Sequence, residues 1–219
     1  MRPGATELTS EDAFAGETDV ALSDVGRGQA SQLAERLAGE KIAAFYASPL
    51  SRTMETASIL AAPHLLAVTP APGLREISHG RWEGMKRPDV EKLYPEEYAR
   101  WESDPFSFAP EGGETGLAVT ARALPALLAI VEAHPEKQVA VVSHKATIRL
   151  LISSLLGFDQ RSYRDRLDQS PASLNVLDFK GPTRARLTLF NDTSHYSATA
   201  SGAPSIPEAR LSRWWDKKE

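Results

Sequence analysis

The sequence predicts an α/β protein with a mainly parallel sheet. Short apolar runs of strand length, at residues 42–47 and 139–142, lead directly into segments with the apolar density of a packed helix. Strand, loop and helix also alternate along most of the chain, an order typical of parallel sheets. With 219 residues the chain is long enough for one domain with a sizeable core.

The individual elements follow from caps and spacing. Ser23 or Asp24 can cap a helix in which Ala30, Leu33 and Leu37 recur at helical intervals. The 42–47 strand is followed by a loop and a second helix. We expect a short strand at 66–69, helices at about 116–134, 148–152 and 160–167, and an antiparallel pair formed by 173–179 and 184–190.

Two segments depart from this alternation. Residues 70–114 are rich in Glu, Arg and Pro and contain Trp82 and Trp101, which is typical of an insertion that folds over the sheet edge as a lid. We therefore expect a single domain at 1–196 and a flexible tail at 197–219. Trp214 and Trp215 in that tail either dock on a partner or form a sticky terminus.

Composition excludes several classes of function. A net charge of -4 argues against binding nucleic acid, which requires a positive field. The absence of Cys excludes disulfides and thiolate nucleophiles, and the five His residues show no metal-ligand spacing. No apolar run suggests a membrane span or signal peptide. We expect a cytoplasmic protein that needs no metal or cofactor.

Polar residues follow two of the predicted strands. His144 ends the 139–142 strand and lies at the start of a helix, where open α/β sheets bind ligands and helix N-termini favour anions. Alternatively, Ser143 only caps the helix and His144 has no role. Arg52 follows the 42–47 strand, although an arginine there commonly pairs at the surface, here with Glu55.

Arg2 and Glu76 complete a candidate anion site. Two arginines with a histidine would neutralise a phosphomonoester dianion, because guanidinium groups match phosphate oxygens. If the lid shields Glu76, we expect its pKa to rise, which would suit a general acid. Otherwise it is a solvated loop carboxylate. His79 is a weaker candidate for the same cleft.

Together these motifs resemble the histidine phosphatase superfamily, in its phosphoglycerate-mutase-like branch. The resemblance rests on residues 2–7 (RPGATE), 22–30, 46–57 (YASPLSRTMETA), 142–144 (VSH), 74–84, 111–114 and 191–195. It implies a three-layer fold with helices on both faces of the sheet. It also implies phosphatase or mutase chemistry, in which an active-site histidine accepts a phosphoryl group. Arg2, Arg52 and His144 would then hold the phosphate, and Glu76 would protonate the leaving oxygen.

The chain also departs from this pattern. Pro3 occupies the position of the family's nucleophilic histidine, and its ring nitrogen is an amide without nucleophilic character. Ala5 replaces a usual Glu or Gln, Thr9 stands where a phosphate-binding Asn is common, and Lys145 stands where Gly is common. Only Met1 precedes Arg2, where the family has a buried central strand, so neighbouring strands would expose their ladder groups.

Three interpretations remain open at this point. The chain is an N-terminally altered relative of an active phosphatase, or a repurposed enzyme that uses Glu76 and His144. Alternatively it is a non-catalytic phospho-ligand binder. In each case the expected partner is a small phosphorylated metabolite, and the oligomeric state is open, with a homodimer as one option.

Overall fold

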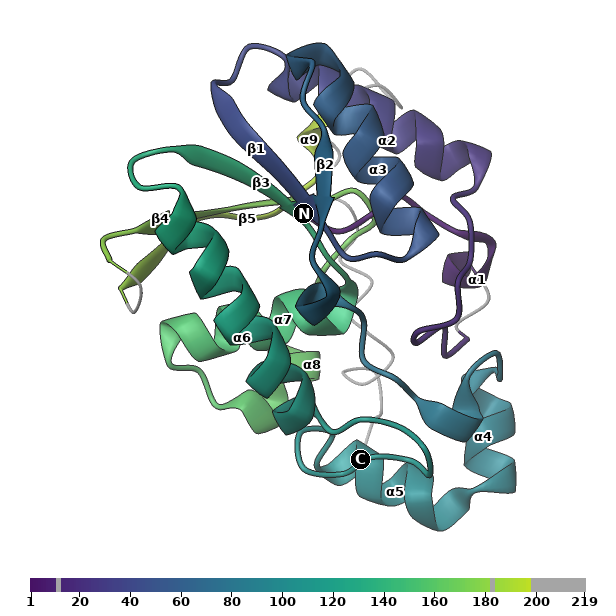
Figure 1. Ribbon diagram of the computed structural model, residues 1–219. Helices are drawn as coiled ribbons and strands as arrows, with labels where there is room; N and C mark the ends of the chain where they lie inside the picture. The colour runs from purple at the N-terminus through teal and green to yellow at the C-terminus, as the bar shows by residue number, and fades with distance from the viewer. Residues whose placement is uncertain (11–12, 182–183, 198–219) are drawn as a thin grey trace.

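The computed structural model describes residues 1–10, 13–181 and 184–197. Residues 198–219 of the predicted tail 197–219, with Trp214 and Trp215, lie outside the described residues. Within them the chain forms an α/β fold with parallel strands between layers of helices, as the sequence predicts (Figure 1).

The main sheet has three parallel strands in the order β2-β1-β3. They are β1 (Ile42–Ala47), β2 (Val68–Pro70) and β3 (Gln138–Val142). Because successive side chains alternate between faces, Phe45 and Ala47 pack with helices α2 (Asp24–Leu37) and α3 (Ser51–Ala61). Tyr46 and Val139 pack with α6 (Gly116–Ala133) on the other side. The apolar runs are therefore covered on both faces.

Helix α2 also fixes the path of the N-terminal segment. Ser23 caps it, with its hydroxyl accepting a hydrogen bond from the Gly26 N–H at 3.1 Å. A Cβ at Gly26 would lie 2.1 Å from the Ala5 carbonyl oxygen, and one at Gly4 would lie 2.2 Å from the Gly26 carbonyl oxygen. Only glycine at these two positions allows such close backbone approach. The chain just after Arg2 is thereby held against α2.

A separate antiparallel pair consists of β4 (Leu174–Phe179) and β5 (Ala185–Asp192), as predicted. Helix α7 (Lys145–Leu156) packs on it through Ile148 and Ile152. The first residues of the chain lie between β3 and β4. Met1 donates its amine to the Val141 carbonyl at 2.8 Å, and its own carbonyl accepts from the Ser143 N–H at 3.0 Å.

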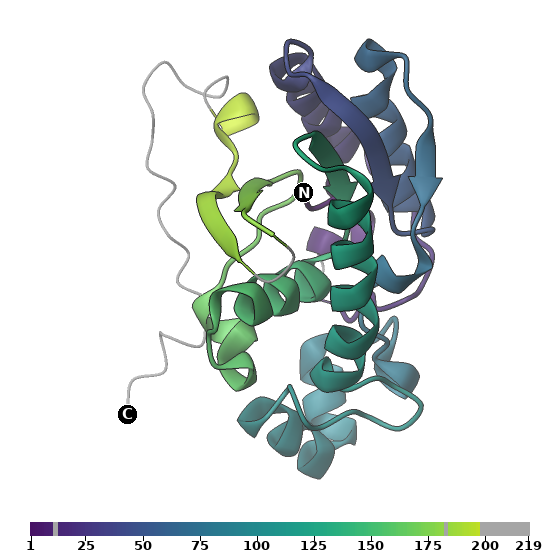
Figure 2. The same ribbon diagram turned by 60° about the vertical axis from the view of Figure 1, so that its left-hand side comes forward.

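A groove of about 980 Å³ continues from Met1 between the two sheets. Figure 2 shows the N-terminus between the main sheet and the β4–β5 pair. The groove is lined largely by apolar side chains of β3, β4, α6 and α7, including Val139, Ile148, Ile152, Leu177 and Phe179. The groove lies beside residues 139–141, where the sequence analysis expected exposed ladder groups.

The predicted insertion forms a lid with its own core. It contains α4 (Arg87–Leu93) and α5 (Pro95–Ser103), which lie at the lower end of the molecule in Figure 1. Trp82, Tyr98 and Trp101 pack there against Phe14, which comes from the loop after α1 (Glu7–Ser10). The lid is therefore joined to the N-terminal loop by an aromatic cluster.

Helix α6 has the length and apolar composition of a membrane span, which the sequence analysis did not expect. In the fold, however, its residues Ala123, Leu127 and Ile130 pack in a cluster with Leu74 and Leu151 of the protein core. The remaining short helices are α8 (Tyr163–Arg166) and α9 (Ser194–Ser197).

Candidate functional site

His144 lies where β3 ends and α7 begins, and only 2% of it is exposed. Its Nε2 atom is 2.7 Å from the Ser48 hydroxyl oxygen. Burial lowers the pKa of His144 to about 3, with Arg52, Arg122 and Arg2 acting in the same direction against Glu76. The imidazole is therefore neutral at physiological pH.

Ser143 does not cap α7, so the capping role given to it in the alternative interpretation is wrong. The Ser143 hydroxyl donates instead to the Leu74 carbonyl at 2.8 Å, which ties the end of β3 to the segment after β2. His144 itself occupies the N-cap position, without a side-chain capping bond.

Arg52 is 6% exposed and points inward from the first turn of α3. Its guanidinium donates to the carbonyl oxygens of Thr18 at 2.7 Å and Gly16 at 2.8 Å. The alternative of a surface pair with Glu55 is wrong, because Glu55 pairs with Arg27 at 2.6 Å. Burial lowers the pKa of Arg52, while Glu76 opposes this shift.

Arg2 reaches the same region from the N-terminus, where its guanidinium donates to the Gln169 carbonyl. Burial, followed by the charge of Arg149, lowers the pKa of Arg2 to about 10, so it remains a cation at neutral pH. Arg2, Arg52 and Glu76 all act electrostatically on His144. The four residues that the sequence analysis drew from distant parts of the chain therefore lie within electrostatic range of one another around His144.

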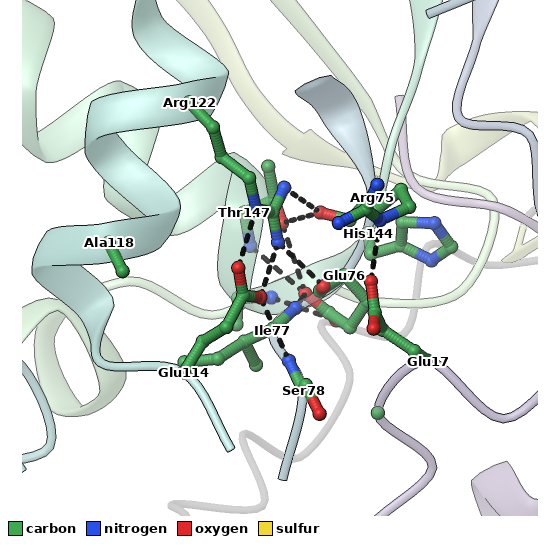
Figure 3. A network of polar contacts seen from close by, with 12 residues as sticks. Glu17, Arg75, Glu76, Ile77, Ser78, Glu114, Ala118, Arg122, His144 and Thr147 are labelled. Atoms are coloured by element: carbon green, nitrogen blue, oxygen red, sulfur yellow. Dashed lines mark hydrogen bonds and ion pairs between the residues drawn. The ribbon is translucent and has the colours of Figure 1, made fainter. Parts of the chain in front are cut away.

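Glu76 lies against the N-terminus of α7 (Figure 3). Its carboxylate accepts hydrogen bonds from the N–H groups of Ala146 and Thr147, both at 3.2 Å, and of Ile77 at 3.0 Å. Burial acts to raise the pKa of Glu76, but the positive charge that His144 carries when protonated, the backbone N–H groups and Arg52 act against burial, and the net shift is downward. The expected rise is therefore not found, and Glu76 is ionised.

The sequence analysis missed the arginine that positions Glu76. Arg122 of α6 donates to both carboxylate oxygens of Glu114, at 2.9 and 2.7 Å (Figure 3). It also donates to the carbonyls of Gly73, Arg75 and Glu76 at 2.8–2.9 Å. An arginine within the apolar helical pattern of residues 116–134 was the available signal. Its bidentate pair clamps the segment that carries Glu76.

Pro3 and Thr9 have different surroundings. Pro3 is buried, and its carbonyl accepts from the Ala172 N–H at 2.8 Å. Thr9 is exposed, and its hydroxyl pairs with the Thr6 hydroxyl at 3.0 Å and accepts from the Thr6 N–H at 3.0 Å. Among the described residues, no hydrogen bond or ion pair connects Thr9 with Arg2, Arg52 or His144.

His79 belongs to the lid core. Its ring lies 4.9 Å from that of Phe14 and 6.2 Å from that of Trp101, measured between ring centroids. Burial lowers the pKa of His79 to about 4, so this imidazole is neutral as well.

Further cations adjoin the site on α7. Burial, together with Arg149 and Arg2, lowers the pKa of Lys145 to about 8. Arg149 is 8% exposed and contacts Asp168 at 3.3 Å. Across the described parts of the chain, no group of three or more His, Asp or Glu residues could hold a metal ion. The arrangement is a group of cationic side chains suited to an anion.

Comparison with known proteins identifies similar chains. The family model described as the histidine phosphatase superfamily (branch 1) matches residues 1–193. Phosphoserine phosphatase 1 of Hydrogenobacter thermophilus is 35% identical over 159 residues, which cover 73% of this chain and 75% of that protein. A glucosyl-3-phosphoglycerate phosphatase of Mycolicibacterium vanbaalenii is 33% identical over 164 residues, 72% of each chain.

Solved structures share the fold. Bacillus stearothermophilus YhfR superposes with a TM-score of 0.83 at 28% identity, covering 89% of this chain and 96% of that one. The mycobacterial glucosyl-3-phosphoglycerate phosphatase Rv2419c in complex with VO3 gives a TM-score of 0.78 at 28% identity, covering 87% and 96%.

Proposed function

This chain belongs to branch 1 of the histidine phosphatase superfamily, and from that premise we propose that it binds the phosphate group of a small phosphorylated metabolite between Arg2, Arg52 and His144. The observation that supports the proposal is that two arginines with backbone carbonyl partners act electrostatically on one buried, neutral imidazole. A phosphate dianion supplies the negative charge and the acceptor oxygens that such a group of donors lacks.

The hydrogen bonds that Arg52 makes to backbone carbonyls support this proposal. Its two terminal nitrogens donate to the neutral carbonyl oxygens of Gly16 and Thr18. Phosphate oxygens are acceptors of the same geometry and carry charge, so an arriving phosphate replaces these bonds with charge-assisted ones. The backbone of the 16–18 loop would move aside as the ligand binds.

Binding without the family's covalent step is the form of activity that best fits these residues. Pro3 offers no nucleophilic nitrogen at the position implied by the resemblance. Glu76 is ionised, so it has no proton to give to a leaving oxygen near neutral pH. We therefore propose a phospho-ligand-binding member of the family.

Hydrolysis is the second candidate. Two relatives are named as phosphatases of phosphoserine and of glucosyl-3-phosphoglycerate, and Glu76 and His144 act on each other electrostatically here. In this version the pair would supply acid–base chemistry on a phosphomonoester without a residue at position 3 taking part. Whether the protein is a homodimer and whether it is cytoplasmic remain predictions.

The test combines binding with a search for turnover. We expect calorimetric titration with inorganic phosphate and with phosphoserine to show binding that Arg52→Met weakens by about 10- to 100-fold, because two charge-assisted hydrogen bonds are lost. The matched control is Arg27→Met, since Arg27 is 44% exposed at its side chain and lies outside the site. Equal losses in both variants would contradict the assignment.

Turnover separates the two candidates. The binding protein should leave p-nitrophenyl phosphate intact and yield no acid-labile phosphoprotein after rapid quenching. Release of p-nitrophenol that His144→Ala abolishes would establish hydrolysis instead. Absence of any binding to phosphate or phosphorylated metabolites would overturn both.

A further inference from the structure

Ser48 lies directly after β1 and is fully buried against His144. Its backbone is already engaged, because its N–H donates to the Val142 carbonyl at 3.0 Å and its carbonyl accepts from the Thr53 hydroxyl at 2.9 Å. Its hydroxyl contacts Nε2 of His144 at 2.7 Å.

The direction of this hydrogen bond follows from burial. Among the described residues, Nε2 of His144 is the one hydrogen-bond partner of the Ser48 hydroxyl. If Nε2 carried the proton and donated it, the hydroxyl proton of Ser48 would be buried without an acceptor, which is unfavourable. The Ser48 hydroxyl therefore donates, and Nε2 accepts.

The charge state of the His144 ring then determines whether Nδ1 carries a proton. Burial is the main cause that keeps His144 neutral; Glu76 opposes it, and the charges of Arg52, Arg122 and Arg2 act in the same direction as burial. A neutral imidazole carries a single N–H group. With Nε2 acting as an acceptor, that proton is on Nδ1. Within the described parts of the chain, Nδ1 has no hydrogen-bond partner.

We propose that Ser48 holds His144 in the tautomer protonated on Nδ1, so that His144 meets a bound phosphate as a hydrogen-bond donor and not as a nucleophile. The inference deepens the proposed function, and the part that concerns the ligand rests on it. Ser48 acts through His144 and is a positioning residue.

This assignment has a chemical consequence. A nitrogen that attacks phosphorus needs a free lone pair, and Nδ1 has none while it carries the proton. His144 therefore does not replace the nucleophile that is missing at position 3. The ring instead adds an uncharged donor to the charges of Arg2 and Arg52, which suits binding without transfer.

The tautomer can be measured without any ligand. In ¹⁵N-labelled protein, the two nitrogens of a neutral histidine give distinct signals for the protonated and the unprotonated atom, and a His144→Gln spectrum assigns them. We expect Nδ1 to be protonated and Nε2 unprotonated at neutral pH. The opposite pattern, or an imidazolium with both nitrogens protonated, would overturn the proposal even if phosphate binds.

Substitutions test the part of the proposal that concerns phosphate binding. Ser48→Ala removes the donor to Nε2, and we expect phosphate affinity to fall about 3- to 10-fold, the effect of one hydrogen bond, together with a changed tautomer signal. The control is Ser58→Ala, an exposed α3 serine whose hydroxyl bonds to the Met54 carbonyl, and it should change neither. A fall in affinity with an unchanged tautomer would refute the positioning role.

Two replacements of His144 test which ring nitrogen donates to the phosphate. The side-chain amide of Asn can place a donor near the position of Nδ1, whereas that of Gln places one near Nε2. We expect His144→Asn to retain more phosphate affinity than His144→Gln. The reverse order would contradict the proposal. If no variant and not even the parent chain binds phosphate, the proposed function fails while the tautomer assignment stands on its spectrum.

Discussion

The two edges of β3 differ in what they meet. One edge pairs in parallel with β1 along its length, from Ala44 opposite Val139 to Ala47 opposite Val142. The other edge meets Met1 at its end and beyond that the apolar groove. The same strand is thus an interior strand on one side and an edge strand on the other.

The residues of the proposed anion site lie on the edge that pairs with β1, whereas the groove lies along the other edge. On the paired side, hydrogen bonds join Ser48, His144 and Glu76 to neighbouring elements, and Arg122 adds its clamp. On the open side, a buried amine and apolar side chains border empty volume. The proposed anion site therefore depends on the edge of β3 that pairs with β1.

The largest expected effect comes from filling the open edge. Joining about five Val and Ile residues to Met1, together with Pro3→His, would supply both a strand and a nucleophile. We expect hydrolysis of p-nitrophenyl phosphate to rise at least ~10³-fold over the parent, a fraction of the acceleration typical of enzymes. An acid-labile phosphoenzyme should accompany it in a rapid-quench assay.

The controls separate the strand from the nucleophile. The same extension with Pro3→Ala should raise the free energy of unfolding by roughly 3 kcal/mol, since apolar burial exceeds the ordering cost, without any hydrolysis. Denaturation in urea measures this. If the extended Pro3→His variant neither gains stability nor cleaves the ester, the comparison between the two edges is wrong.

The buried amine gives the same experiment a pH signature. Burial lowers the pKa of the Met1 amine from 8.0 to about 5, so between these values the unfolded chain binds more protons than the folded one. The stability contributed by this group is therefore present above pH 8 and is lost as the pH falls toward 5. An extension converts the amine to an amide and should abolish this dependence.

The hydrogen bonds that hold the segment carrying Glu76 can be removed by substituting Arg122. Arg122→Ala leaves the Glu114 carboxylate and three backbone carbonyls without their donor, and we expect a loss of about 3 kcal/mol in the free energy of unfolding. The matched control is Arg161→Ala, whose side chain is 68% exposed and pairs only with Asp159 nearby, and it should change stability by less than ~0.5 kcal/mol. Similar effects in both variants would show that the clamp is dispensable.

The smallest expected effect is that of Glu76→Gln. The loss of charge at the N-terminus of α7 should cost about 1 kcal/mol at pH 7. Because the folded-state pKa of Glu76 lies below 4.5, its contribution is present above that pH and is lost as the pH falls through the folded value. Urea midpoints of parent and variant should therefore converge under acid conditions. A gap that stays constant with pH would contradict the lowered pKa.

The sequence by itself determined the elements and their order, because strand and helix patterns, caps and turns are local. It identified β1, β3, the β4–β5 pair and the insertion that carries α4 and α5. It also placed His144 at the end of a strand, since the carboxyl ends of parallel strands meet at one sheet edge.

Only the tertiary structure decided which side chains meet and in what charge state. Ser48 and His144 are 96 positions apart, and Arg122 reaches back 46 positions to the Glu76 carbonyl. The direction of the Glu76 pKa shift was missed because it depends on N–H groups from α7, contributed by a distant segment. Long-range geometry sets local electrostatics, and no sequence pattern carries that geometry.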